Sequence, residues 1–410
     1  MPENSNTSKL SNRFIYALVG FVLVNLVIWK TSAFGLFTPQ KNLQQLVQQN
    51  DAEDPTSMSK TWPWWIAKSY LEEQNTPDVV VLGDSQMATA IFTSDAKASG
   101  KKVDVVAHRH VEGLEQRLSE KFAKPVSVFN AAMAGSMASD HDLIARSLFL
   151  DDENTEKPKL VVIGISPRIF IDNTLPAASV TEPFRFYSQC ADPGNLAQLA
   201  FADYFGQMNW YINKCLPLGR LKTELQTTYS PAKLLPKTKT VKKNTQDADF
   251  MKGMFASATK VEKDAWFVPA FMPYLFKDNT AEYVNRYTNP NPPMYAGELA
   301  FFGDLLERLN DNKVPTLIVM MPSLGPNRTL LPDNFWKVFR SNISTLCKKN
   351  QATLVDLSAS PNFIIDDYLD TVHLNATGGS KLLAEIANSI ADNRQLTAGL
   401  KNQVASKSRN

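Results

Sequence analysis

Five short apolar runs constrain the fold of this chain more than any other feature of its sequence. Each run is mostly apolar and too continuous for a half-exposed strand, which is typical of a strand buried on both faces of a sheet. Each is followed by Gly, Asn, Ser or Pro, and stretches with helical periodicity lie between them. The pattern predicts a doubly wound, flavodoxin-like α/β fold, with a parallel sheet between two layers of helices. The expected strands are residues 79–82, 126–129, 160–165, 316–321 and 353–357.

Four other segments carry apolar residues at the spacing of one helix face. They are residues 112–122, 298–309, 335–349 and 376–391, and their apolar faces are expected to cover the sheet. In open parallel sheets, ligands bind beyond the carboxyl ends of the strands. Polar residues that directly follow the predicted strands are therefore the first candidates for a functional site.

The composition is that of an ordinary globular protein, and it excludes several functional classes. The 410 residues are 44% hydrophobic and carry a formal net charge of +2, which fits neither a disordered chain nor a general nucleic-acid-binding protein. There is no glycine-rich phosphate loop, the three cysteines lack zinc or redox spacing, and His108 and His110 lack a third ligand at metal spacing. We therefore expect no cofactor, no metal ion and no nucleic-acid partner.

The amino-terminal region indicates a membrane anchor. Residues 14–37 contain a single charged residue, and the segment is long enough for a membrane span, which takes about 20 residues. Because Lys9 and Arg13 precede it, we predict a cytoplasmic tail at residues 1–13 and a single-pass signal anchor at 14–37. A cleaved signal peptide is the alternative, because residues 31–33 are Thr, Ser and Ala. In both cases the rest of the chain is expected outside the cytoplasm, in the periplasm or on the outer face of the membrane.

Beyond the predicted anchor, the pattern divides the chain into a linker, a main domain and a tail. The juxtamembrane linker is residues 38–75, the domain is residues 76–392, and the polar tail is residues 393–410. Residues 172–295 interrupt the alternation of strands and helices, and a connection of this length indicates a large insertion or cap.

Three local clusters in the linker and the insertion have two interpretations each. Tryptophans of the linker either lie at the lipid interface or pack against the domain. Aromatic residues early in the insertion either form a small second core or line a groove that stacks on sugars. Lysines in its middle form either a solvated loop or a contact with anionic lipid or polymer. The clusters are Trp62, Trp64 and Trp65; Phe184, Phe186, Tyr187, Tyr204, Phe205, Trp210 and Tyr211; and Lys233, Lys237, Lys239, Lys242 and Lys243.

Ser85 lies in DVVVLGDSQM, residues 78–87, where an apolar run stops abruptly at Gly-Asp-Ser and presents a serine after the first strand. A serine hydroxyl needs a base within hydrogen-bond reach to act as a nucleophile, and the base needs a group that orients it. Asp370 and His373 lie in DTVHLNATGG, between the fifth strand and the last helix. This arrangement predicts a Ser, Asp and His triad assembled from the two ends of one domain. The alternative for Ser85 is a serine that only caps the following helix.

The Gly-Asp-Ser and Asp-x-x-His motifs resemble those of the SGNH/GDSL hydrolase superfamily, and the resemblance covers roughly residues 76–392. It implies that Ser85 is the nucleophile and that Asp370 and His373 complete the triad. It also implies that the backbone N–H of Gly135, in VFNAAMAGS, joins that of Ser85 in an oxyanion hole.

The third sequence block of this family departs from its usual form in this chain. The family has Gly-x-Asn-Asp after the third strand, whereas this chain reads Gly-Ile-Ser-Pro at residues 164–167. The oxyanion asparagine is therefore missing, and a preorganised donor of this kind contributes about 3 to 4 kcal/mol. Ser166, with a hydroxyl, and Arg168, with a charged guanidinium, are the candidate replacements for substrate binding.

A single amino-terminal span, an exported domain of this length and the order Ser, Asp, His are similar to the DltD-like proteins of cell-envelope O-acylation. The resemblance implies transfer of an acyl group to an envelope polysaccharide or polymer. It also implies two partners, membrane lipid and a multi-pass membrane-bound O-acyltransferase. Two alternatives stay open. One is a carbohydrate or lipid esterase of the SGNH type, and the other is an inactive SGNH module that binds polysaccharide or scaffolds a membrane complex.

Overall fold

The computed structural model describes residues 15–16, 19–24, 42–53, 61–215, 267–268, 276–288 and 291–401. The chain forms two compact units, and the one made of residues 42–200 and 245–410 contains the sheet and every candidate site residue. The other unit, residues 1–41 and 201–244, contains helix α9 (Tyr204–Cys215).

Of the predicted tail and anchor at residues 1–37, the structure describes only residues 15–16 and 19–24, and the five lysines of the insertion lie outside the described residues. Among the helices that the structure describes, none combines the length and the apolar character needed to cross a membrane.

The sheet has five strands, all parallel, in the order β3-β1-β4-β6-β7. Numbered by their sequence within this sheet, the strands follow the order 2-1-3-4-5, which is a doubly wound order whose switch point lies between β1 and β4. The predicted parallel α/β sheet is therefore present. Its strands are β1 (Val79–Leu82), β3 (Val128–Asn130), β4 (Leu160–Ile165), β6 (Thr316–Met320) and β7 (Thr353–Asp356).

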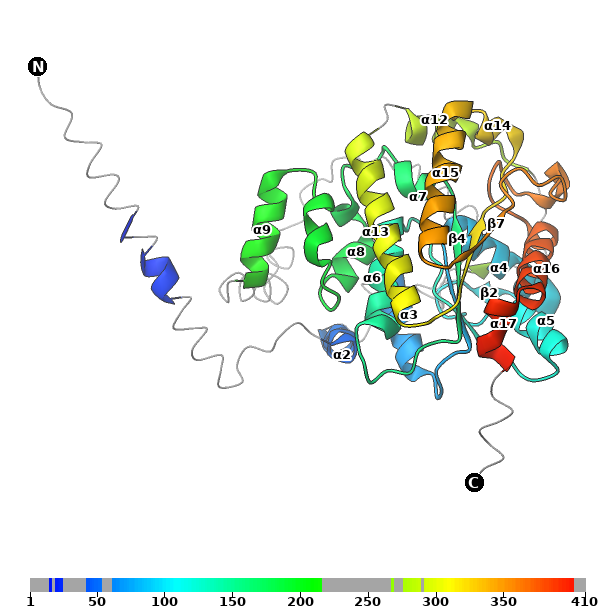
Figure 1. The fold of residues 1–410 in the computed structure, drawn as a ribbon, viewed down its shortest axis with the longest axis horizontal. Coiled ribbons are helices and arrows are strands. Elements are labelled where there is room, and N and C mark those ends of the chain that lie inside the picture. Colours follow the sequence, from blue (N-terminus) through cyan, green and yellow to red (C-terminus); the bar gives the residue numbers. More distant parts are fainter. Residues whose placement is uncertain are drawn as a thin grey trace, which may run out of the picture. The chain divides into compact units, whose positions relative to one another are not determined.

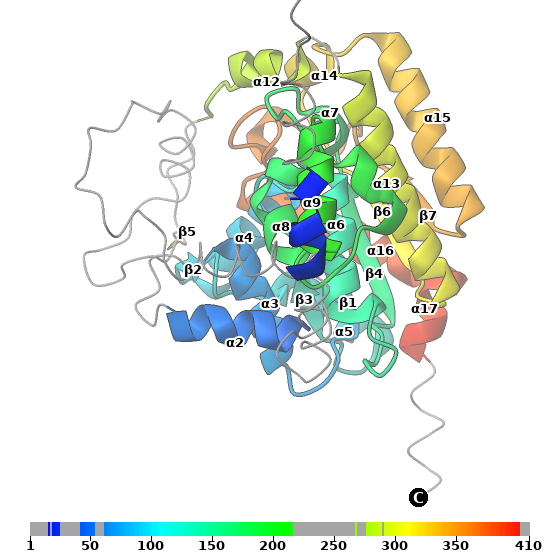
Figure 2. The same ribbon diagram turned by 90° about the vertical axis from the view of Figure 1, so that its left-hand side faces the viewer.

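Helices cover both faces of the sheet (Figures 1 and 2). One layer packs through α16 onto α4 and α5, and the other through α13 onto α6 and α15. Val79 and Val81 of β1 belong to the core shared with the first layer, as the alternation of side chains along a strand requires. The first layer is α4 (Ser85–Ser99), α5 (Glu112–Phe122) and α16 (Ala376–Asp392), and the second is α6 (Ala138–Ala145), α13 (Pro292–Asp311) and α15 (Asp333–Lys349).

Helix α16 packs closely against α4 and against η6 (Ile365–Asp367) at two adjacent glycines. A Cβ atom on Gly379 of α16 would lie 2.2 Å from the carbonyl oxygen of Ala90 in α4. A Cβ atom on Gly378 would lie 2.3 Å from the carbonyl oxygen of Asp367. Neither position has room for a side chain, so the two glycines set how closely α16 packs against the rest of the domain.

The insertion packs onto the domain through two short helices. α8 (Glu182–Tyr187) contacts α6, and its Phe184 and Tyr187 are buried, so this part of the aromatic cluster is core, as one of the two interpretations predicted. α12 (Thr280–Tyr287) contacts α7 (Arg168–Ile171) and α14 (Gly325–Arg328). The remaining described elements are β2 (Val103–Asp104), which pairs with β5 (Phe267–Val268), and the short helical turns η2 (Arg146–Leu150), η3 (Ala178–Val180), η4 (Gly194–Leu199) and η6 (Ile365–Asp367).

Both ends of the predicted domain differ from the structure. In the linker, α2 (Leu43–Glu53) and α3 (Trp62–Glu72) pack together, and the indole of Trp64 is buried and donates to the carbonyl of Val47. Helix α3 also contacts α8, where the Tyr187 hydroxyl donates to the carbonyl of Pro63 at 2.9 Å. The linker thus packs against the domain, and the lipid interface is the wrong interpretation for Trp64. At the other end, residues 394–401 are not a polar tail. They form α17 (Arg394–Lys401), because Leu396 and Leu400, four residues apart, bury one face.

Candidate active site

Ser85 is the first residue of α4, directly after the tight turn that ends β1. In this turn the Asp84 carboxylate is fully buried and accepts the N–H of Gln86 at 2.9 Å, which caps the helix. A Cβ atom on Gly83 would lie 2.5 Å from the Cβ of Met87, so only glycine fits between strand and helix. The turn holds the half-buried Ser85 at the carboxyl end of the sheet, beside the switch point.

The structure brings the three predicted triad residues into one chain of hydrogen bonds. His373 Nε2 lies 2.9 Å from Ser85 Oγ, and His373 Nδ1 lies 2.7 Å from Asp370 Oδ2. The other oxygen of Asp370 accepts the N–H groups of Val372 at 2.9 Å and of His373 at 2.8 Å. Because the carboxylate is fixed by its own loop, it favours the tautomer in which Nδ1 carries the proton and Nε2 faces the serine.

Nearby negative charge favours the protonated form of His373. Burial alone would lower the pKa of its imidazole, but the charge and hydrogen bond of Asp370 and the charges of Asp84 and Glu282 raise the pKa above its ordinary value. A buried base that is stabilised as an imidazolium can hold the proton of a serine during attack on a carbonyl.

Gly135 lies in the loop after β3, which we call the oxyanion loop (residues 131–137). Its φ of +83° is in the region that L side chains rarely adopt, so the turn requires glycine. Among the described residues, neither the backbone N–H of Gly135 nor that of Ser85 has an acceptor. Two unpaired N–H groups that follow neighbouring strands are the elements of an oxyanion hole.

Ser166 and Arg168, the predicted substitutes for the missing asparagine, are both engaged with protein acceptors. The Ser166 hydroxyl donates to the Asp84 carboxylate at 3.1 Å. Arg168 donates from Nη1 to the carbonyl of Ser136 at 2.9 Å and from Nη2 to that of Gly135 at 3.3 Å. Arg168 is therefore buried against the carbonyls of the oxyanion loop, and its contact with a substrate stays a prediction.

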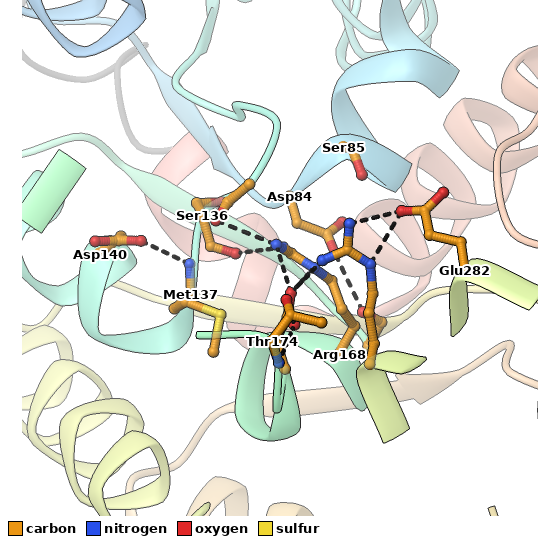
Figure 3. Close-up of polar contacts among 12 residues, drawn as sticks. Asp84, Ser85, Ser136, Met137, Asp140, Arg168, Thr174 and Glu282 are labelled. Atoms are coloured by element: carbon orange, nitrogen blue, oxygen red, sulfur yellow. Dashed lines mark hydrogen bonds and ion pairs between the residues drawn. The ribbon is translucent and has the colours of Figure 1, made fainter. Parts of the chain in front are cut away.

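A buried charge network next to the site was not predicted from the sequence (Figure 3). Asp172, fully buried, accepts from Arg168 Nε at 3.2 Å and from Arg286 Nη1 at 2.5 Å. Arg286 of α12 also pairs with Glu282 at 2.6 Å. Both i,i+4 pairs, Arg168 with Asp172 and Glu282 with Arg286, are visible in the sequence as helical spacing. The sequence does not show that the two pairs meet at Asp172, because this depends on how the insertion folds back onto the domain.

The end of the insertion also anchors the loop that carries Asp370 and His373. Asn279 Oδ1 accepts the backbone N–H of Thr371 at 3.0 Å as well as its hydroxyl, and Lys277 donates its N–H to the carbonyl of Leu369 at 2.9 Å. Asn279 is buried, so the contact is shielded from water. Within the described ranges, no group of His, Cys, Asp or Glu side chains is arranged to hold a metal ion.

These contacts define a serine, histidine and aspartate site at the switch point of a doubly wound α/β sheet. No protein-family model and no curated protein matches the chain. Among solved structures, the chain is similar to a catalytic mutant of Axe2, an acetylxylan esterase from Geobacillus stearothermophilus. The similarity covers 78% of this chain and 96% of that chain, with 11% sequence identity and a TM-score of 0.33.

Proposed function

We propose that this protein transfers acyl groups through an acyl-enzyme formed on Ser85. The observation that carries the proposal is the unbroken chain of contacts from Ser85 Oγ through His373 to Asp370, with distances of 2.9 and 2.7 Å. A serine that merely caps a helix does not require a buried imidazole oriented by a buried carboxylate. The arrangement matches the roles of nucleophile, general base and orienting group.

The proposed reaction starts with an ester. As Ser85 Oγ bonds to the ester carbonyl carbon, His373 Nε2 takes the serine proton, and the N–H groups of Ser85 and Gly135 hold the oxyanion. The bond to the leaving alcohol then breaks, and His373 returns the proton to that alcohol. In the second half, an acceptor hydroxyl loses its proton to His373 and attacks the acyl carbon. The bond to Ser85 breaks, and the serine is reprotonated.

The acceptor decides whether the protein is a transferase or an esterase. We propose a hydroxyl of an envelope polysaccharide or polymer, outside the cytoplasm and at the membrane. The support is the sequence's similarity to DltD-like proteins, together with the segment at residues 14–37, which contains a single charged residue. A multi-pass membrane-bound O-acyltransferase would then supply the acyl groups. With water as acceptor, the same acyl-enzyme gives a carbohydrate or lipid esterase.

The nucleophile is tested by treating the full-length protein in detergent with a fluorophosphonate and measuring its intact mass. We expect one adduct on the wild type, none on Ser85→Ala and a much slower reaction of His373→Ala. A wild type that stays unmodified would contradict the proposal and favour the binding module.

The acceptor is tested separately, by turning over an aryl acetate with and without a polysaccharide oligomer. Acetylated oligomer, detected by mass spectrometry, supports transfer. Release of acetate alone, at a rate that the oligomer does not change, supports the esterase.

A further inference from the structure

The oxyanion loop is held by side chains as well as by its neighbours in the chain. The Ser136 hydroxyl lies 3.0 Å from the carbonyls of both Gly83 and Met133. The guanidinium of Arg168 also donates to the carbonyls of Gly135 and Ser136 in this loop. Figure 3 shows the contact between Arg168 and Ser136. The direction of the Gly135 N–H therefore depends on where the Arg168 guanidinium lies.

Arg168 is fixed in turn by Asp172. The Oδ2 atom of Asp172 accepts from Arg168, and its Oδ1 atom accepts the N–H of Thr174 at 3.2 Å and its hydroxyl at 2.5 Å. Burial alone would raise the pKa of the Asp172 carboxyl, but Arg168 and Arg286 hold the pKa below its ordinary value. The carboxylate is thus ionised and shared between two arginines, one from the domain and one from the insertion.

Arg286 comes from α12, and α12 reaches both halves of the site. At its start, Asn279 binds Thr371 in the loop of the base. Along its length, Tyr283 is buried and Glu282 contributes to the raised pKa of His373. One face of one insertion helix is therefore connected to the base on one side and to the oxyanion loop on the other.

We infer that α12 is a positioning element for the oxyanion hole, and that Arg286 is the positioning residue that acts through Asp172 and Arg168 on Gly135. The inference rests on the proposed acyl-enzyme. It assigns part of the insertion a role in the rate of the chemical step, separate from any role in binding an acceptor. Arg286 itself does not touch the reacting atoms.

The test uses Arg286→Ala in the full chain, with Arg286→Lys as the conservative variant. Loss of Arg286 leaves Asp172 with a single cation, so Arg168 and the oxyanion loop are expected to shift. Small misplacements of this kind cost up to about 100-fold in rate. We expect kcat for an aryl acetate to fall roughly 10- to 100-fold, with KM changed by less than about twofold. The reason is that the Gly135 N–H binds the oxyanion, which is present in the transition state and not in the bound ester. Arg286→Lys should recover part of kcat.

A second readout does not depend on turnover. Amide hydrogen exchange of residues 131–137 should be faster in Arg286→Ala than in the wild type. The matched control is Arg308→Ala, which removes an arginine of α13 that also pairs with a carboxylate four residues away, Asp304, at 2.6 Å. It should leave both kcat and the exchange of residues 131–137 unchanged.

The possible failures are distinguishable. If the wild type forms the Ser85 adduct but Arg286→Ala keeps its kcat and its exchange pattern, the role of α12 is wrong and the acyl-enzyme stands. A fall in kcat that Arg286→Lys does not relieve, with faster exchange throughout the domain, also overturns it, because that is general destabilisation. If the wild type forms no adduct, the proposed function fails and takes the catalytic role of α12 with it.

Discussion

The fully buried carboxylate of Asp84 takes part in the turn, in the neighbouring strand end and in the electrostatics of the base. It accepts the N–H of Gln86 at the start of α4 and the hydroxyl of Ser166 after β4. Its charge also contributes to the raised pKa of His373. One side chain therefore links the ends of the two strands that flank the switch point, and it also favours the protonated form of His373.

Asp370→Asn is expected to lower kcat for an aryl acetate about 10⁴-fold, the scale known for a triad aspartate. The amide keeps the size of the side chain, but it can present an N–H to His373 Nδ1 and so select the wrong tautomer. Steady-state kinetics checks the prediction, with Asp366→Asn, an exposed residue of the same segment, as control. Equal turnover by Asp370→Asn and the wild type would show that this carboxylate does not orient the base.

The raised pKa of His373 predicts a displaced acid limb of the pH profile. The base must be neutral to accept the serine proton, so kcat/KM should fall on acidification through a pKa above the ordinary 6.5. Asp84→Asn removes a negative charge that stabilises the imidazolium and keeps a good helix cap. Its acid limb should therefore move to lower pH. A profile identical to that of the wild type would mean that Asp84 does not act on His373.

Single residues of the site were predictable where a short motif follows a strand, and not otherwise. Ser85, Asp370 and His373 each lie within a few residues of a strand or helix boundary, where chain direction is fixed. Arg286 and Asp172 are 114 residues apart in the chain, and only the folding of the insertion brings them together. The contacts of Arg168 were not predictable for the same reason, because its acceptors lie in a loop after another strand.

Among the elements, the contact of α16 with α4 carries the triad most directly, because Ser85 begins α4 and His373 lies just before α16. Gly379 allows the two helices to approach without a side chain between them, and Gly378 allows α16 to pack against Asp367 of η6. The distance between nucleophile and base therefore depends on helix packing as well as on the loops.

Gly379→Ala is expected to destabilise the fold by about 2 kcal/mol, because its Cβ would lie 2.2 Å from the backbone oxygen of Ala90. Gly303→Ala in α13 is the matched control. Its Cβ would make an ordinary contact of 3.4 Å with Leu346, and a helical alanine is up to about 1 kcal/mol more favourable than glycine. Urea unfolding measures both variants. The prediction is wrong if the two substitutions change the free energy of unfolding equally.

Strands and long helices could be predicted from the sequence, whereas short elements could not. β1 and β4 begin and end where their continuous apolar runs do, and α5 matches its apolar stripe. β3 is displaced toward Asn130, because pairing with β1 sets its bounds. Short helices such as α8 and α12 depend on tertiary packing for their stability, so local periodicity does not reveal them.

For the molecule as a whole, three buried carboxyl groups between α6 and α13 decide how stability changes with pH. Burial raises the pKa of Asp140 to about 7, that of Asp142 to about 7 and that of Glu298 to about 8. Unfolded, these groups lose their protons near pH 4. Between pH 4 and their native pKa values the native state binds more protons, so stability falls as pH rises. The raised pKa of His373 acts in the same direction above pH 6.5.

Glu298→Gln should reduce this loss of stability. Between pH 6.5 and 8, Glu298 alone is expected to account for roughly 2 kcal/mol of the fall. Buried His141, whose native pKa is low, opposes this fall slightly, because the unfolded histidine loses its proton over the same range. Glutamine can still accept a hydrogen bond from Ser139, as Glu298 does. Urea unfolding at the two pH values tests this. The same pH dependence in both proteins would show that Glu298 is ionised in the native state.

Ser85 and the base that activates it are 288 residues apart in the chain. A ribosome therefore makes the nucleophile early and the base near the end of synthesis. Under the proposed mechanism, the emerging chain carries an inert alcohol that cannot capture acyl groups until His373 has emerged and α16 has packed against α4. Any product truncated before Asp370 is equally silent. Under the proposed mechanism, acylation of Ser85 therefore requires synthesis through His373 and packing of α16 against α4.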